Sequence, residues 1–431
     1  MINLRPEKID DLTPERTRSI MERSMEDISS IYEETRLIVN DVRANGDAVA
    51  LKHYRKHKAD ITTADLEVTR EEIDEAYKQV DRKVVDALKT AAENIVKFHK
   101  AQLEREMWSI EVTKGILAGR VTRAMDIVGC YIPGGRAAYP SSILMTVLPA
   151  KVAGVGEVVA ITPPQKGMKA TPVTLVAADI ARCDRIFKVG GPWGIAGLAY
   201  GTESMPRVVK IVGPGNKYVT AAKMIVYGQV DIDSPAGPSE SLILADESGR
   251  PELIAWDFLS QAEHDPDSAA VMVTTSRKLA DEVCDIIARE FENLPRKEIL
   301  QSSLSRHSYV LLARDMDQAI DFTNQYAAEH LQIMTNDPFI TLNRIRHVGS
   351  IFMGPYAPVP VGDYASGTNH VLPTGQCARM FSGLSVDDFI KKPTFQYLSK
   401  EGLAGLKDVV TTLAEAEGLP IHAKTVRARF E

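Results

Sequence analysis

The chain has 431 residues, 44% of them hydrophobic and 25% charged, and this length predicts two or three domains because single domains usually run to roughly 200 residues at most. The formal net charge of −7 argues against a general nucleic-acid binder, which usually presents a basic surface. No run is apolar enough to cross a bilayer and the first residues lack the apolar core of a signal peptide, so we expect neither a membrane partner nor secretion.

Residues 1 to about 125 are charged and predict helices. Apolar residues recur at helical spacing in 24–57 and again in 84–103. His53 and His57 lie within a basic helical face. A solvated surface is the favoured interpretation there, and a metal pair is the less frequent one.

From Asp126 onward, short β-rich runs alternate with helical segments. The predicted strands are 126–132, 157–162, 185–189 and 207–213 in a first series, then 269–275, 308–313, 331–335 and 350–354 in a second. Such alternation is typical of βαβ units on a parallel sheet. Two modules predict a cleft between them, with ligands at the carboxyl ends of the strands. From about Arg379 the pattern returns to helix.

Glycine clusters follow three strands of the first series, in 131–142, 189–197 and 212–223. Glycine lets the backbone approach a ligand closely, and helix amino termini favour anions. None of the clusters matches GxGxxG, and the sequence contains no P-loop. A phosphate-bearing cofactor is one interpretation, and tight turns without a ligand are the other.

Candidate chemistry-bearing residues lie elsewhere. Gln261 and His264 are three apart at the end of an apolar helix and would share one face. Acids and histidines also occur together at three later element ends or loops: Glu329 with His330, Asp363 with His370, and Glu417 with His422. Nitrogen and oxygen ligands would suit zinc. A lone histidine at an element end is more often structural, so spacing alone leaves the metal site a hypothesis.

The four cysteines are scattered and form no CxxC pair. They are Cys130, Cys183, Cys284 and Cys377. Scattered thiols indicate buried or free cysteines in a reducing compartment, and we expect a cytoplasmic protein.

Long stretches of the chain, in the same order, resemble the histidinol dehydrogenase family. They are 131–145, 201–204, 210–223, 235–240, 259–268, 327–331, 362–374, 383–389 and 415–423. The resemblance implies a zinc-dependent, NAD-linked alcohol and aldehyde dehydrogenase. Such an enzyme oxidises L-histidinol to L-histidine through the aldehyde with two NAD, the last step of histidine biosynthesis.

The implied fold is α/β, with two incomplete Rossmann-like parallel-sheet domains of the aldehyde and histidinol dehydrogenase type, a helical N-terminal arm and a C-terminal helical tail. We expect the arm in 1–25, a first, discontinuous α/β domain in 26–127 plus 240–380, an NAD-binding domain in 128–239, and the tail in 381–431. The resemblance implies a homodimer in which the tail crosses over, so that Glu417 and His422 serve the partner's active site.

The resemblance also implies the site residues. The implied ligands of one zinc per subunit are Gln261, His264, Asp363 and His422. The implied catalytic pair is Glu329 and His330. The implied substrate contacts are Ser239, Gln261, His264, Glu329, Asp363, His370, Glu417 and His422, and the implied NAD contacts are Tyr131, Trp193 and Asn216. The family usually has glutamine in place of Trp193, which predicts altered NAD affinity because an indole cannot accept a hydrogen bond.

The residue types fit this chemistry. Removing a hydride from an alcohol carbon requires the hydroxyl proton to leave, and a histidine such as His330 is suited to take it. The aldehyde must then gain water, which the Glu329 carboxylate can activate. Zinc has no redox chemistry and would orient the substrate. The alternatives are a related dehydrogenase acting on another amino alcohol or a sulfonated diol and, from another class, a zinc hydrolase.

Overall fold

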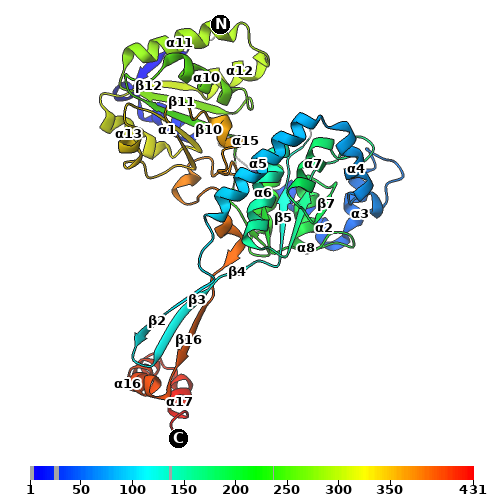
Figure 1. Cartoon of the computed structure of the whole chain (residues 1–431), viewed down its shortest axis with the longest axis vertical. Coiled ribbons are helices and arrows are strands. Elements are labelled where there is room, and N and C mark those ends of the chain that lie inside the picture. The colour runs from blue at the N-terminus through cyan, green and yellow to red at the C-terminus, as the bar shows by residue number, and fades with distance from the viewer. Residues whose placement is uncertain (1–3, 24–28, 135–137, 236) are drawn as a thin grey trace. The chain divides into compact units, whose positions relative to one another are not determined.

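The computed structural model describes residues 4–23, 29–134, 138–235 and 237–431 (Figure 1). Two compact units make up the chain, one formed by residues 1–102 and 126–389, the other by 103–125 and 390–431. The expected boundary between residues 25 and 26 lies outside the described residues, as do small parts of the resembling stretches 131–145 and 235–240. No helix in the described ranges is long and apolar enough to span a membrane.

A five-stranded parallel sheet forms one half of the first unit, in the order β7-β6-β5-β8-β9. Its strands are β5 (Ile127–Tyr131), β6 (Glu157–Ile161), β7 (Arg185–Phe187), β8 (Lys210–Val212) and β9 (Asp231–Ile232). The connecting helices are α6 (Pro140–Ala153), α7 (Pro172–Ile180), α8 (Gly191–Tyr200) and α9 (Lys217–Val226). Right-handed crossovers place α6 and α7 on one face and α8 and α9 on the other. The order reverses between β5 and β8, which is the switch point of a doubly wound sheet.

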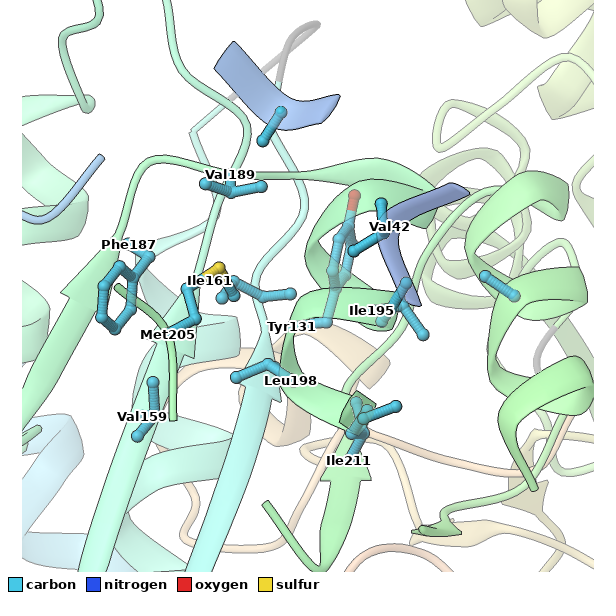
Figure 2. Packing of buried hydrophobic residues seen from close by; sticks show 14 of the residues in the cluster. Val42, Tyr131, Val159, Ile161, Phe187, Val189, Ile195, Leu198, Met205 and Ile211 are labelled. Atoms are coloured by element: carbon cyan, nitrogen blue, oxygen red, sulfur yellow. The ribbon is translucent and has the colours of Figure 1, made fainter. Parts of the chain in front are cut away.

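The helices of the N-terminal hundred residues cover this same sheet. They are α2 (Ser29–Asn45), α3 (Asp47–Tyr54), α4 (Arg70–Gln79) and α5 (Arg82–Lys100). α2 packs on α8 and α9, α3 packs on α8, α4 packs on α7, and α5 packs on α6. Val42 and Tyr54 join Ile195 and Leu198 in one buried cluster, part of which Figure 2 shows. This differs from the expected grouping of 26–127 with 240–380. Amphipathic periodicity shows which helix face is buried but not which sheet it is buried against.

A six-stranded parallel sheet forms the other half, in the order β1-β12-β11-β10-β13-β14. Its strands are β1 (Pro6–Lys8), β10 (Glu240–Ala245), β11 (Ala269–Thr274), β12 (Tyr309–Leu312), β13 (His330–Met334) and β14 (Ser350–Met353). Two of them are absent from the predicted series. β10 is central and wholly buried, and β1 brings the expected helical arm into the sheet as an edge strand.

Helices cover both faces of this sheet. α10 (Pro251–Ala262), α11 (Arg277–Phe291) and α12 (Lys297–Arg306) contribute to one apolar cluster, and α1 (Pro14–Glu22) and α13 (Met316–Tyr326) to the other. The short helices α14 (Pro338–Leu342) and α15 (Val359–Tyr364) come before and after β14. Because a crossover helix runs antiparallel to its strands, α10 ends at the amino edge of the sheet. Gln261 is carried there by the last turn of α10.

The second unit is a small sheet with two helices. β2 (Met107–Thr113), β3 (Ile116–Val121) and β16 (Thr394–Leu398) form an antiparallel sheet, and β4 (Arg123–Ala124) pairs with β15 (Ile390–Lys391). α16 (Lys400–Ala416) and α17 (Pro420–Arg427) pack against each other. The prediction of helix throughout residues 1–125 is therefore wrong for 107–124. The prediction that the chain is helical again from about Arg379 misses the strands β15 and β16. The last segment of this unit starts at Ile390, not at the expected residue 381.

Candidate active site

A pocket of about 110 Å³ lies where the two sheets of the first unit meet. Its lining residues are Pro214, Asp233, Ser234, Gly237, Ser239, Glu329, His370, Val371, Leu372 and Thr374. Pro214 and Asp233 follow the carboxyl ends of β8 and β9, whereas Ser239 and Glu329 precede β10 and β13. The pocket thus joins the carboxyl edge of one sheet to the amino edge of the other. A larger, more open depression of about 390 Å³ beside Arg207 and Tyr227 is lined by none of the candidate residues.

Glu329 is held rigidly at this amino edge. It is only 6% exposed, and its Oε2 accepts hydrogen bonds from the Ser239 hydroxyl and the Glu240 backbone N–H, each at 2.8 Å. Ser239 Oγ in turn accepts a hydrogen bond from Gln261 Nε2 at 3.1 Å. Three of the predicted residues therefore form one hydrogen-bonded chain from α10 to β13. The other carboxylate oxygen of Glu329 carries none of these bonds.

His330 lies between two carboxylates. Its Nδ1 is 3.3 Å from Glu329 Oε2 and its Nε2 is 3.6 Å from Asp363 Oδ1. Because 3.6 Å exceeds hydrogen-bond length, Nε2 is buried without a hydrogen-bond partner in the described part of the chain. Burial alone would lower the pKa of His330, but the charges of Glu329 and Asp363 raise that pKa well above its ordinary value. Both carboxylates would therefore stabilise the ring once it has taken up a proton from a substrate.

Gln261 has an unpartnered oxygen. The residue is 1% exposed. Its Nε2 donates to Ser239, whereas its Oε1 has no hydrogen-bond partner among the residues that the structure describes. Leaving a buried polar atom unpaired costs about 1–3 kcal/mol. An amide oxygen in this state is suited to a cation or to a donor group of a ligand.

Asp363 and His264 complete the part of the predicted zinc site that belongs to the first unit. Burial would raise the pKa of Asp363, but His330, His370 and His264 together lower it, so the four side chains are electrostatic neighbours. His264 is exposed and lies just beyond the end of α10. Within the described ranges, no three histidine, cysteine or carboxylate groups are close enough to hold a metal.

Glu417 and His422 belong to the second unit. Glu417 caps the C-terminus of α16, and His422 lies in the first turn of α17. The roles expected for these two residues stay predictions.

His370 joins the two halves of the first unit. Its Nδ1 is 2.8 Å from the backbone oxygen of Asp363, and its Nε2 is 3.4 Å from the Ser142 hydroxyl on α6. The neighbouring Asn369 amide donates to the backbone oxygen of Met145, also on α6, at 2.7 Å. The loop that holds His370 is therefore fixed against the helix that follows β5.

The expected cofactor contacts lie together at the carboxyl edge of the five-stranded sheet. Tyr131 ends β5 and is buried in the cluster of Figure 2. Asn216 caps α9, its Oδ1 accepting from the backbone N–H groups of Tyr218 and Val219. Trp193, in the first turn of α8, is partly buried and packs on the same apolar cluster.

Trp193 is stacked on His53, the centroids of the two rings lying 3.5 Å apart at an interplanar angle of 25°. One face of the indole is therefore already covered by the protein. His53 is half-buried and burial lowers its pKa to about 4, so it is not the solvated surface residue that the sequence predicts.

The structure adds Glu240 and Arg23 to the site. Glu240 contacts both members of the predicted catalytic pair, and Arg23 forms an ion pair with Glu240 at 2.8 Å. One signal for Glu240 is present in the sequence: it is a carboxylate at the start of an otherwise apolar strand. No comparable signal marks Arg23, which comes close only through the folding of the N-terminal segment.

Comparisons with known proteins identify the family of the chain. A family model described as histidinol dehydrogenase matches residues 21–430. The histidinol dehydrogenases of Methanocaldococcus jannaschii and Methanococcus maripaludis are each 51% identical to this chain over 424 residues. Each alignment covers 98% of this chain, and it covers 98% of the first relative and 99% of the second. The crystal structure of histidinol dehydrogenase from Elizabethkingia anophelis matches with a TM-score of 0.94 at 35% identity, covering 99% of this chain and 98% of that one.

Proposed function

The chain belongs to the histidinol dehydrogenase family, a family of NAD-dependent oxidoreductases, and from this premise we propose its detailed reaction. The substrate is L-histidinol, which loses two hydrides in turn, to two NAD molecules, and becomes L-histidine through L-histidinal. The observation that carries the proposal is the buried pair Glu329 and His330, held by Ser239 beside the unpartnered oxygen of Gln261.

In the first oxidation His330 is the base. As a hydride leaves the carbinol carbon, the hydroxyl proton must leave with it, and a group within hydrogen-bond reach has to accept it. Among the described residues, Nε2 of His330 has no hydrogen-bond partner, and it is therefore available for that proton. Nδ1 faces the Glu329 carboxylate and the backbone oxygen of Glu240, which hold the ring in place.

In the second oxidation Glu329 assists the addition of water. The aldehyde takes up water across its carbonyl bond, and the resulting hydrate loses a hydride and a proton to give the acid. Oε2 of Glu329 is occupied by two donors, while Oε1 is left to accept a proton from the incoming water. Both residues act on one carbon because they are neighbours at the start of a single strand.

Zinc fits the residues present. Gln261, His264 and Asp363 would hold it, with His422 as the fourth ligand, and the buried free oxygen of Gln261 is the feature that a cation would satisfy. When bound, the ion orients the substrate so that the carbinol carbon lies beside His330, without itself changing oxidation state.

NAD accepts the hydride. We place it at the carboxyl edge of the five-stranded sheet, against Tyr131, Trp193 and Asn216. The turn after β8 supports this placement, because a side chain at Gly213 (φ +117°) would collide with the backbone oxygen of Tyr131 at 2.2 Å. Glycine at such a turn lets strand ends come close together and leaves the helix amino terminus open to a phosphate.

We further propose a cytoplasmic homodimer in which the second unit serves the partner's site through Glu417 and His422. The second unit exposes many large apolar side chains, which a partner subunit would cover. They are Met107, Trp108, Ile110, Val112, Leu117, Tyr397, Val409, Leu413, Leu419 and Ile421. The four cysteines are unpaired, as expected in a reducing compartment.

A stoichiometry assay tests the reaction. Complete turnover of a limiting amount of L-histidinol should yield two NADH per substrate molecule, and His330→Ala should reduce the rate to background. A yield of one NADH with L-histidinal as the end product would contradict the four-electron reaction. A His330→Ala enzyme with an unchanged rate would contradict the assignment of the base.

A further inference from the structure

Behind the predicted catalytic pair lies a second layer of charge. The side chains of Arg23 and Glu240 are 2% and 3% exposed, and Nε of Arg23 is 2.8 Å from Oε2 of Glu240. The two groups form an ion pair, but the N–H bond of Arg23 Nε does not point at the carboxylate well enough to form a hydrogen bond. Burying two charges costs several kcal/mol each unless further contacts compensate. A buried pair beside an active site therefore calls for a functional explanation.

Glu240 contacts both members of the predicted catalytic pair. Its backbone N–H donates to Oε2 of Glu329 at 2.8 Å, and its own Oε1 accepts the backbone N–H of Glu329 at 3.1 Å. Its backbone oxygen is 3.2 Å from Nδ1 of His330. These three contacts fix both the backbone and the side chain of Glu329 and one ring nitrogen of His330.

Arg23 in turn fixes the Glu240 carboxylate. Its other guanidinium nitrogens donate to the backbone oxygens of Met21 and Tyr326. The guanidinium also lies over the Tyr326 ring, 3.5 Å from its centroid. Arg23 has φ +54°, a backbone conformation that costs a non-glycine residue about 1–3 kcal/mol and is concentrated at functional sites.

We propose that the Arg23–Glu240 ion pair is a positioning device for the predicted acid–base residues. Arg23 and Glu240 act through Glu329 and His330, and neither is assigned a contact with substrate. The pair sets the location of the Glu329 carboxylate and the tilt of the His330 ring. A displacement of about 1 Å in such groups can cost 10²-fold in rate while substrate binding is kept. The inference rests on the roles proposed above for Glu329 and His330.

A charge-balance cycle tests the inference in the full-length, zinc-loaded enzyme. In Glu240→Gln, the new side-chain amide turns its oxygen to Arg23. Its NH2 group then faces the backbone N–H of Glu329, so two donors face each other. We expect kcat to fall at least 10-fold, with KM for L-histidinol and zinc content within about twofold of wild type. In the double variant Arg23→Met/Glu240→Gln, the amide oxygen is free to accept from Glu329, and we expect kcat to recover by at least threefold over the single variant.

Lys210→Met is the matched control. Lys210 is also buried and ion-paired, with Asp231 and Asp388, but it starts β8 at the amino edge of the five-stranded sheet and does not line the pocket. Its loss should lower the melting temperature and leave kcat per folded enzyme unchanged. If Glu240→Gln alone does not fold, Glu240→Asp keeps the charge and withdraws the carboxylate from Glu329 by one methylene, with the same expected loss of kcat.

Wild-type kcat in folded Glu240→Gln or Glu240→Asp overturns the inference. An equal loss of kcat in Lys210→Met also overturns it, because the effect would then be general destabilisation. Absence of recovery in the double variant overturns the part assigned to Arg23. Glu329→Gln is measured in the same series: if it keeps wild-type kcat, the proposed role of Glu329 itself has failed, whatever Glu240→Gln does.

Discussion

Ser239 is the point at which the amide from α10 and the carboxylate before β13 meet. Its hydroxyl donates to Glu329 and accepts from Gln261. Ser239→Ala removes a hydrogen bond to a charged group, worth about 1.5–3 kcal/mol, and leaves the Gln261 amide without its acceptor. We expect kcat/KM for L-histidinol to fall about 10- to 100-fold, since 1.4 kcal/mol corresponds to tenfold. Steady-state kinetics at saturating NAD measure this.

Ser303→Ala is the control for that substitution. The Ser303 hydroxyl makes one buried hydrogen bond, to the backbone oxygen of Ser268 at 2.8 Å, and touches none of the candidate residues. Its loss should cost stability, about 1 kcal/mol, and no activity. Equal activities of the two variants would show that Ser239 contributes only to folding.

Trp193 stands where the family resemblance predicts a glutamine. Because one face of the indole is covered by His53, it can offer only its other face and its edge to a nucleotide. Trp193→Gln supplies an amide that both donates and accepts, and we expect the Kd for NAD to decrease about fivefold, consistent with one added hydrogen bond. Titration of NAD by calorimetry measures this, with exposed Trp256→Gln as the control. Identical affinities would remove Trp193 from the cofactor site.

At the residue scale, several residues singled out from the sequence lie close together in the structure, whereas the residues that hold them in place were not predicted. Ser239, Gln261, Glu329, His330 and Asp363 are brought together as the resemblance implies. Glu240 and Arg23 were not predicted. Their function depends on burial and on a contact between segments more than 200 residues apart, and neither property is expressed in local sequence spacing.

At the scale of elements, the two sheets use opposite edges at one pocket. Ligand sites are expected at the carboxyl ends of parallel strands, and the five-stranded sheet follows that rule at Pro214 and Asp233. The six-stranded sheet instead contributes its amino edge, where β10 and β13 begin. The helix α10 has its C-terminus at that edge and supplies Gln261 there. In the proposed mechanism, proton transfer and cofactor binding would therefore use different sheets.

The α/β class and most strands of both sheets were predicted correctly from alternating strand and helix patterns. The β10 strand was missed, because its six buried residues lack the period-two alternation of a half-exposed strand. The hairpin of β2 and β3 was missed for the opposite reason. All seven residues of β2 are exposed. Its apolar residues therefore pack against no core, and their alternation with polar residues does not mark a buried face.

The turn after β8 is the element on which the proposed cofactor edge depends. Gly213→Ala would place a methyl group 2.2 Å from the backbone oxygen of Tyr131 in addition to straining a positive φ. Gly228→Ala is the matched control, since Gly228 also has positive φ (+91°) but nothing within 4 Å of the added carbon. Both variants should lose about 1 kcal/mol from backbone strain. We expect only Gly213→Ala to weaken NAD binding, by at least 10-fold in calorimetric titration, and equal Kd values would argue against this edge as the cofactor site.

At the scale of the whole molecule, the first unit contains the acid–base pair and three of the four proposed zinc ligands, while His422 lies in the second unit. The sequence could suggest exchange of this unit between subunits only through its family resemblance, because no residue pattern within one chain encodes which copy a segment serves. The exposed apolar side chains of the second unit are compatible with exchange.

Subunit complementation distinguishes exchange from a site built within one chain. His330→Ala removes the base from the first unit, and His422→Ala removes the ligand from the second, so each homodimer should be inactive. When equal amounts of the two chains are refolded together or co-expressed, about half of the dimers are heterodimers. If the second units are exchanged, one of the two sites in each heterodimer combines an intact first unit with an intact second unit. We expect the mixture to recover about a quarter of wild-type activity per site, because half of the dimers then carry one working site of two. If each second unit serves its own chain, every site in the heterodimer retains one of the two substitutions and the mixture stays inactive.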